Sequence, residues 1–355
     1  MPSRPFAARQ SQFLSMRGWN AEEDIMNSDS QVERSRLTGA MTALVTPFKG
    51  GNVDYDAIGE LAEWHIQSGI SALVACGTTG EASTLTWDER LRIIRTCLKV
   101  SNGRVPIIAG TGTSSTELTI AHTSAALSCG ADAALIVTPF YNRPNQDGIV
   151  RHFEAIAARV PIPVIVYNVP SRTGVDISLQ ALDRLSQMPS ILGIKDATGD
   201  VRRVEEMRNA FGDRFILLSG HDASAHAFNL LGGDGMISVM ANVLPHVFVA
   251  LQNACIKGDW PTARYIHQRL KPVLEAFELD TNPCPIKAAL KHRRGMRDEV
   301  RLPLITVADD VAAQIASALD HLGGVTAPDH GAADDAAFNL REKSPVHPAP
   351  LAWRV

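Results

Sequence analysis

Ile191-Leu-Gly-Ile-Lys195 is a short, continuous apolar run that ends in a lysine. Apolar runs without polar alternation are typical of parallel strands that are covered on both faces. A cationic amine is costly to bury, so the lysine indicates one of two arrangements. It is either a partly neutral, nucleophilic amine or a side chain that reaches solvent at the strand end. The first arrangement suggests a Schiff base with a carbonyl substrate.

Seven further apolar runs accompany this one at a regular spacing, and each is followed by a helix-like pattern. They are Thr42-Ala-Leu-Val-Thr46, Ala72-Leu-Val-Ala-Cys76, Pro106-Ile-Ile-Ala109, Ala133-Ala-Leu-Ile-Val-Thr138, Pro163-Val-Ile-Val-Tyr167, Phe215-Ile-Leu-Leu218 and Gly235-Met-Ile-Ser-Val239. Eight strand-helix units of this length fit a closed (β/α)8 TIM barrel better than an open sheet. Ser114-Ser-Thr-Glu117 fits a capping box that begins one of the helices.

The pattern divides the chain into four parts. Residues 37–259 carry the predicted catalytic barrel, and residues 260–322 show further helical patterns that predict a C-terminal helical region. Residues 323–355 are rich in Ala, Pro and Asp, which predicts a disordered tail. Residues 1–36 are interpreted as a disordered extension, with a true start at Met26 or an organellar transit peptide as alternatives.

Composition excludes several classes of protein. Of the 355 residues, 45% are hydrophobic, which is ample for a large core, and the formal net charge of -4 provides no basic field for nucleic acid. No apolar run approaches the roughly 20 residues of a membrane helix. The odd number of scattered cysteines favours a reducing, cytoplasmic compartment and argues against zinc. They are Cys76, Cys97, Cys129, Cys255 and Cys284.

Polar groups of complementary kinds follow several of the predicted strands. They are Gly77-Thr-Thr-Gly-Glu81, Thr138-Pro-Phe-Tyr-Asn-Arg-Pro144, Tyr167-Asn-Val-Pro-Ser-Arg-Thr-Gly174 and Lys195. Because the carboxyl ends of barrel strands share one face, we expect these groups to surround one site. No other lysine is predicted at such a position, and Lys287 is interpreted as the beginning of a helix.

Each of these groups also has a structural interpretation. The glycine-flanked pair Thr78-Thr79 suits a small carboxylate, but it also suits a tight strand-to-helix turn. Tyr167 is placed to relay protons near Lys195, or it packs inside the barrel. Arg172 is able to hold a second carboxylate with two hydrogen bonds, or it is a solvated loop residue.

Together these segments resemble the family of pyruvate-dependent class I lyases that includes the dihydrodipicolinate synthases and the N-acetylneuraminate lyases. The resemblance extends from about Leu37 to Leu322. It also rests on Gly193-Ile-Lys-Asp-Ala-Thr-Gly199 and Asn282-Pro-Cys-Pro-Ile-Lys287. It implies condensation of pyruvate with L-aspartate 4-semialdehyde to give 4-hydroxy-tetrahydrodipicolinate in lysine biosynthesis.

The same resemblance implies roles for four catalytic residues. Lys195 forms the Schiff base with pyruvate, while Tyr167, Tyr141 and Thr78 make a proton relay. In the family the tyrosine equivalent to Tyr141 completes the site of a neighbouring subunit, which implies a homotetramer built as a dimer of dimers. The covalent imine on Lys195 implies that no cofactor is required.

Five further residues are implied to bind substrate. Thr79 holds the pyruvate carboxylate, Arg172 holds the carboxylate of the incoming aldehyde, and Ile237 lines the pocket through its carbonyl. Gly77 and Gly220 are the remaining substrate-binding positions.

Some positions depart from the family pattern. His221 stands where an aspartate is common and Met240 stands where smaller residues are frequent, so the second-substrate pocket is expected to differ. The positions that match the lysine effector pocket predict weak or absent feedback. They read Trp87, Arg90, Ser114, Leu118 and Phe140.

Two alternatives to the interpretation as a synthase remain. The first is a related pyruvate-imine lyase or dehydratase that acts on a 2-keto-3-deoxy sugar acid, sialic acid or a hydroxyproline-derived imino acid. The second is a barrel that binds a small molecule without catalysis.

Overall fold

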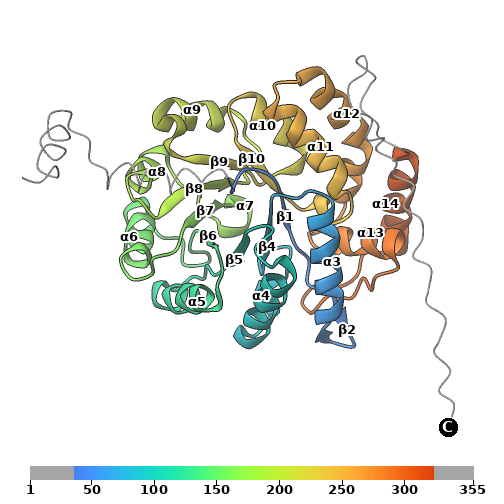
Figure 1. Ribbon diagram of the computed structural model, residues 1–355, viewed down its shortest axis with the longest axis horizontal. Coiled ribbons are helices and arrows are strands. Elements are labelled where there is room, and N and C mark those ends of the chain that lie inside the picture. The colour runs from blue at the N-terminus through green and yellow to red at the C-terminus, as the bar shows by residue number, and fades with distance from the viewer. Residues whose placement is uncertain (1–35, 324–355) are drawn as a thin grey trace, which may run out of the picture.

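The computed structural model, which describes residues 36–323, contains a closed barrel of eight parallel strands surrounded by helices (Figure 1). The predicted fold is therefore confirmed. In order around the barrel, the strands are β1 (Gly39–Ala43), β4 (Ala72–Ala75), β5 (Ile107–Gly110), β6 (Ala133–Val137), β7 (Val164–Asn168), β8 (Ile191–Asp196), β9 (Ile216–Ser219) and β10 (Gly235–Ser238), which pairs with β1. The predictions of a disordered extension and a disordered tail concern residues 1–35 and 324–355, which lie outside the described residues.

Helices follow the strands and form the outer layer (Figure 1). They are α3 (Tyr55–Gln67), α4 (Trp87–Ser101), α5 (Thr116–Cys129), α6 (Gln146–Ala157), α8 (Leu179–Ser186), α9 (Arg202–Phe211), α10 (Ala225–Leu230) and α11 (Pro245–Ile256). The one-turn helix α7 (Pro170–Thr173) follows β7 and lies over the middle of the barrel instead (Figure 1). Three more helices follow in the described chain: α12 (Trp260–Phe277), which packs against α11, then α13 (Cys284–Arg294) and α14 (Asp309–Leu322), which pack against each other and against α12. Within residues 36–323, no helix has the length and apolar character needed to cross a membrane.

One predicted helix start is wrong in detail. α5 is capped by Ser115, whose hydroxyl accepts a hydrogen bond from the Leu118 amide, so no capping box forms at Ser114. Glu117 instead forms an ion pair with Arg159 at the surface. A complete capping box does occur at α4, where the Thr86 and Glu89 side chains each bind the other residue's backbone.

Strand alternation divides the buried residues into two layers. Side chains such as Ile165 and Leu218 fill the barrel interior, whereas Val166 and Ile194 pack outward against the helices. Since Tyr167 pairs with Lys195 in the register between β7 and β8, both side chains belong to the inner face at the carboxyl ends of the strands.

A short antiparallel hairpin, β2 (Phe48–Lys49) and β3 (Asn52–Val53), follows β1 and was not predicted from the sequence. The Glu299 carboxylate accepts hydrogen bonds from the Gly50 and Gly51 amides at its tip. Arg301 donates to the Gly51 carbonyl at 2.9 Å, so the segment after α13 binds this hairpin at two residues, Glu299 and Arg301.

Candidate active site

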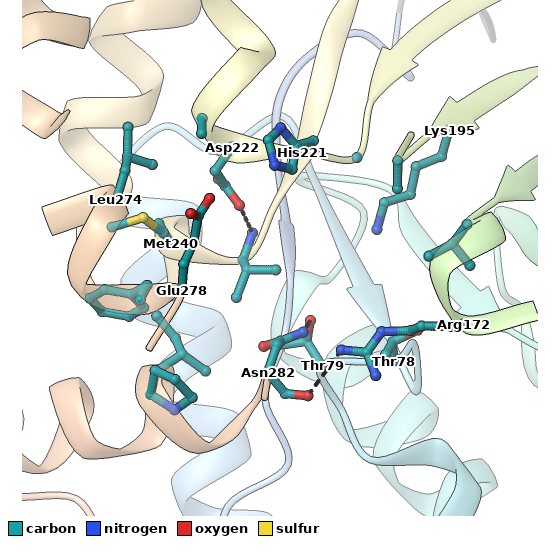
Figure 2. A pocket seen from close by; sticks show the side chains of 18 of the residues that line it. Thr78, Thr79, Arg172, Lys195, His221, Asp222, Met240, Leu274, Glu278 and Asn282 are labelled. Carbon is teal, nitrogen blue, oxygen red and sulfur yellow. Dashed lines mark hydrogen bonds between the residues drawn. The ribbon is translucent and has the colours of Figure 1, made fainter. Parts of the chain in front are cut away.

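A cavity of about 230 Å³ lies at the carboxyl ends of the strands, and Lys195 is in its wall (Figure 2). Lys195 extends from the inner face of β8 and is only 5% exposed. Its Nζ lies 4.4 Å from the centre of the Tyr167 ring. Among the described residues no carboxylate forms an ion pair with this amine and no group accepts a hydrogen bond from it. The amine is therefore available to a substrate in the cavity.

Gly220 gives the lysine its space. A Cβ atom at this position would lie 2.9 Å from Lys195 Cε and 2.8 Å from the Ala197 Cβ. Such contacts are shorter than carbon atoms tolerate, so any larger residue would displace the Lys195 side chain.

The Thr78-Thr79 pair forms a tight turn after β4. The Gly80 and Glu81 amides donate to the carbonyls of Gly77 and Thr78, both at 3.1 Å. Thr79 is 2% exposed, and its hydroxyl accepts a hydrogen bond from Asn282 Nδ2 at 3.0 Å. The structural interpretation as a tight turn is therefore confirmed, and the same turn presents both threonines to the cavity, so carboxylate binding stays a prediction.

A buried ion pair between Lys287 of α13 and Glu81 stabilises the end of this turn. Lys287 Nζ lies 2.5 Å from Glu81 Oε1, and both side chains are 1% exposed. The lysine also donates to the Glu299 carbonyl at 2.7 Å, and Glu81 Oε2 accepts from the Arg301 amide. Burial lowers the pKa of Lys287, and the Glu81 carboxylate opposes that shift. Glu81 adopts a left-handed backbone with φ of 53°, so the pair also holds an uncommon conformation.

Arg172 lies on the one-turn helix α7 and points toward the cavity beside Thr78 (Figure 2). Its guanidinium donates a long hydrogen bond, 3.4 Å, to the Asn282 carbonyl, and no carboxylate of the described residues forms an ion pair with it. Most of its hydrogen-bonding capacity therefore remains for an anionic ligand.

The opposite wall of the cavity carries acidic and apolar side chains. Asp222 accepts hydrogen bonds from the Ser238 hydroxyl and from the Val239 amide, and burial raises its pKa. The imidazole of His221 is fixed by a contact of 2.9 Å between Nδ1 and the Ser224 hydroxyl. Glu278, Met240, Leu274 and Phe277 complete this wall.

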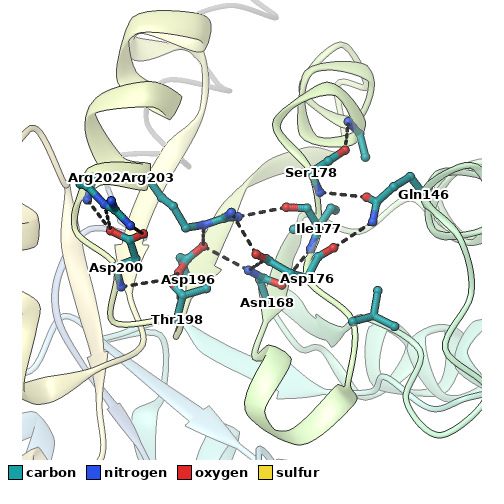
Figure 3. Close-up of polar contacts among 12 residues, drawn as sticks. Gln146, Asn168, Asp176, Ile177, Ser178, Asp196, Thr198, Asp200, Arg202 and Arg203 are labelled. Carbon is teal, nitrogen blue, oxygen red and sulfur yellow. Dashed lines mark hydrogen bonds and ion pairs between the residues drawn. The ribbon is translucent and has the colours of Figure 1, made fainter.

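Outside the barrel, a polar network joins the ends of β7 and β8 (Figure 3). Asp196 is 3% exposed and binds Asn168 Nδ2 at 3.2 Å, Thr198 at 2.5 Å and Arg203 Nε at 3.0 Å. Asn168 also donates to Asp176 at 2.8 Å. Because Asn168 and Asp196 directly follow Tyr167 and Lys195, the network fixes the backbone that carries those two side chains.

The structure brings most of the predicted site residues to the cavity. Its walls include Lys195, Tyr167, Thr78, Thr79, Arg172 and Gly220. Gly77 lies at an adjoining cavity of about 330 Å³ that shares Thr78, Tyr167 and Arg172.

Two predicted residues lie elsewhere. Ile237 is fully buried in the inner barrel layer and is not part of the cavity wall. Tyr141 is 93% exposed, has a φ of 73° and touches neither cavity. Of the three residues predicted to form the proton relay, therefore, Tyr167 and Thr78 line the cavity within one chain and Tyr141 does not.

Sequence reasoning missed several residues of the cavity wall. Asn282 binds both Thr79 and Arg172, yet it was noted only as part of a family motif. Asp222 was not considered although it follows β9 directly after Gly220 and His221, and Glu278 was not considered because it follows none of the eight strands. Glu278 directly follows α12, outside the eight repeating units, so only the folded chain shows that it lines the same cavity as Lys195.

Comparison with known proteins shows which proteins share this arrangement. Residues 36–322 match the model of the dihydrodipicolinate synthetase family. The chain is 46% identical over 285 residues to the 4-hydroxy-tetrahydrodipicolinate synthase of Thermodesulfovibrio yellowstonii, covering 80% of this chain and 98% of that protein. It is 47% identical over 270 residues to the enzyme of the same name from Pseudomonas aeruginosa, covering 76% and 92%.

Solved structures show the same likeness. The crystal structure of the chloride-inhibited dihydrodipicolinate synthase from Acinetobacter baumannii, complexed with pyruvate, matches with a TM-score of 0.79 and 43% identity. The match covers 81% of this chain and 99% of that one. The dihydrodipicolinate synthase of Aquifex aeolicus matches with a TM-score of 0.79 and 39% identity, covering 80% and 98%.

Proposed function

The chain belongs to the dihydrodipicolinate synthetase family and is a class I lyase that condenses pyruvate with L-aspartate 4-semialdehyde, and we propose that Lys195 is the residue that carries pyruvate. The product is 4-hydroxy-tetrahydrodipicolinate, an intermediate of lysine biosynthesis. The observation that supports Lys195 is its buried amine, which faces the cavity and has no carboxylate partner within residues 36–323.

Imine formation comes first. The neutral Lys195 amine attacks the C2 ketone of pyruvate to form a carbinolamine, and loss of water gives the iminium. Tyr167, whose ring lies 4.4 Å from the lysine Nζ, and Thr78 move the protons of these steps. The Thr79 hydroxyl binds the pyruvate carboxylate while Asn282 holds that hydroxyl in place. Gly220 leaves room for the Lys195 side chain that carries pyruvate, and Gly77, which lies at the adjoining cavity, remains a predicted substrate-binding position.

Carbon–carbon bond formation follows. Loss of a proton from the methyl group converts the iminium into an enamine, whose terminal carbon attacks the aldehyde of the second substrate. The resulting alkoxide takes up a proton, and Arg172 binds the carboxylate of the incoming molecule. Attack by the enamine restores the iminium on Lys195. The ammonium group of the second substrate loses a proton, and the resulting amine attacks the iminium carbon, closes the ring and displaces Lys195 as an amine, which regenerates the free enzyme. The lysine amine supplies the electrophilic activation, so we propose that no metal or organic cofactor is required.

Borohydride trapping tests the role of Lys195. Incubation with pyruvate and borohydride should reduce the imine to a stable secondary amine, which mass spectrometry of the peptide carrying Lys195 would detect. The Lys195→Ala variant should lose this adduct, whereas Lys291→Ala, which removes an exposed lysine, should retain it. An adduct that persists in Lys195→Ala would overturn the assignment.

We also propose a homotetramer in which Tyr141 acts in a neighbouring subunit. Tyr141 is 93% exposed beside Phe140, which is 38% exposed, so an aromatic surface is available to a second copy. Mixing dissociated Lys195→Ala and Tyr141→Phe subunits should restore part of the activity that each homo-oligomer lacks. No recovery in mixed oligomers, confirmed by mass, would contradict an action across subunits.

The cellular compartment and the response to lysine are two further proposals. We propose that the protein works in the cytoplasm, because all five cysteines are free thiols. Lysine inhibition should be weak, since Trp87 is stacked on His122 with 3.8 Å between ring centres where the family places polar effector contacts. Strong inhibition at millimolar lysine would contradict this expectation.

A further inference from the structure

The cavity around Lys195 has an unequal distribution of charge (Figure 2). Arg172 supplies a cation on one side, near Lys195, while Asp222 and Glu278 lie together on the opposite wall. A ligand that carries both a carboxylate and an ammonium group would fit this arrangement, with its anion toward Arg172 and its cation toward the acidic wall.

The two acidic side chains are not equivalent. The Asp222 carboxylate is already occupied, because Ser238 and Val239 donate hydrogen bonds to its two oxygens. Burial also raises its pKa, which disfavours its charged form. Asp222 is therefore a poor partner for a new cation.

Glu278 is the available carboxylate. It stands at the carboxyl end of α12, where its backbone amide binds the Glu275 carbonyl at 3.2 Å and so fixes the base of the side chain. Figure 2 shows the side chain directed into the cavity between Met240 and Asp222. Among residues 36–323, no side chain or backbone amide forms a hydrogen bond or an ion pair with its carboxylate.

We propose that Glu278 binds the α-ammonium group of the second substrate and so selects an amino aldehyde over the same aldehyde without the amine. This inference rests on the proposed reaction, in which the second substrate carries a carboxylate, an ammonium group and an aldehyde on one four-carbon chain. Arg172 binds the carboxylate and Glu278 the adjacent ammonium, which leaves the aldehyde free to reach the enamine on Lys195. Glu278 is thus a specificity-determining residue.

The test compares two ligands that differ only in the amine. In Glu278→Gln, the KM for L-aspartate 4-semialdehyde should rise about 10- to 50-fold, the effect of removing one charged hydrogen-bond partner. The competitive inhibition constant of 4-oxobutanoate, which lacks the amine, should change less than twofold. Glu278→Asp should recover part of the affinity for the amino aldehyde only.

Glu275→Gln is the matched control. It removes the same charge one turn earlier on α12, where Glu275 pairs with Lys271 at the surface, and it should change neither constant. Equal changes for both ligands in Glu278→Gln, or an effect as large in Glu275→Gln, would overturn the inference and leave the synthase reaction intact. Wild-type protein that traps pyruvate but does not turn over the amino aldehyde would instead overturn the reaction, and this inference with it.

Discussion

Among residues 36–323 two lysines are buried, and they differ in what surrounds the amine. Lys287 is 1% exposed and lies 2.5 Å from the Glu81 carboxylate, with the Glu299 carbonyl as a second acceptor. Lys195 is 5% exposed, has no carboxylate partner among the described residues, and its amine lies over the face of the Tyr167 ring. Burial alone therefore does not identify a nucleophile, because a carboxylate partner keeps an amine protonated and occupied.

The largest expected effect comes from removing the unpaired lysine. Lys195→Met should lower kcat by on the order of 10⁴-fold or more, since the covalent step is lost. The free energy of unfolding should change by less than about 1 kcal/mol, because the substitution leaves no buried charge without a partner. Urea denaturation and steady-state rates measure the two quantities. A large loss of stability would show that Lys195 also has a structural role.

Removing the paired lysine, Lys287, should mainly lower the stability of the fold. Lys287→Met leaves the Glu81 carboxylate buried and unpaired, which should cost about 3–5 kcal/mol of unfolding free energy. The double variant Glu81→Met with Lys287→Met should recover most of that loss. If the double variant is as unstable as the single one, hydrogen bonds to Glu299 and Arg301 would matter more than the ion pair.

Replacing Tyr167 tests whether its hydroxyl takes part in the reaction of Lys195. Tyr167→Phe keeps the ring beside the amine and removes only the hydroxyl, so it should lower kcat about 10²- to 10³-fold while pyruvate remains trappable. Rapid-quench trapping should show slower formation of the imine. An unchanged rate would assign Tyr167 to packing, the alternative that the sequence left open.

Two buried histidines, His65 and His152, show how burial without a carboxylate partner lowers the pKa of a base. Burial lowers the pKa of His65 to about 4, although its ring contacts the Leu61 and Ala241 carbonyls. Because the unfolded chain binds this proton near pH 6.5, stability should be lost as pH falls from 6.5 toward 4, by about 2 kcal/mol at pH 5. His152, whose pKa burial also lowers to about 4, adds a similar loss.

Denaturation at pH 7 and pH 5 measures this loss. His152→Phe should make the pH dependence shallower, because one of the two depressed groups is gone. An equally steep dependence in the variant would contradict the assignment to His152.

The barrel was predictable because its signal is local. Each strand is a continuous apolar run and each strand end precedes a polar loop, so Lys195, Tyr167 and Thr78 were recognisable from nearby residues alone. The hairpin β2–β3 was not predicted, since strands of two residues carry no periodic signal.

The sequence interpretation of Lys287 was incomplete for a different reason. The residue was interpreted as the beginning of a helix and no second lysine was expected at such a position, yet it is more buried than Lys195. Its partner Glu81 is 206 positions away, and no local pattern reports a pair at that separation. The contact of Glu278 with the cavity escaped prediction for the same reason.

The contacts from Asn282, Lys287 and Arg301 to the Thr78-Thr79 turn and its neighbours have a consequence for synthesis of the chain. A ribosome completes every barrel strand, including β8 with Lys195, before it adds these three residues. A nascent chain therefore contains the buried lysine before it contains the residues that hold the Thr78-Thr79 turn in place. Chains that end before Asn282 would keep Lys195 but lack these contacts, so the last part of the described chain completes the cavity around the lysine.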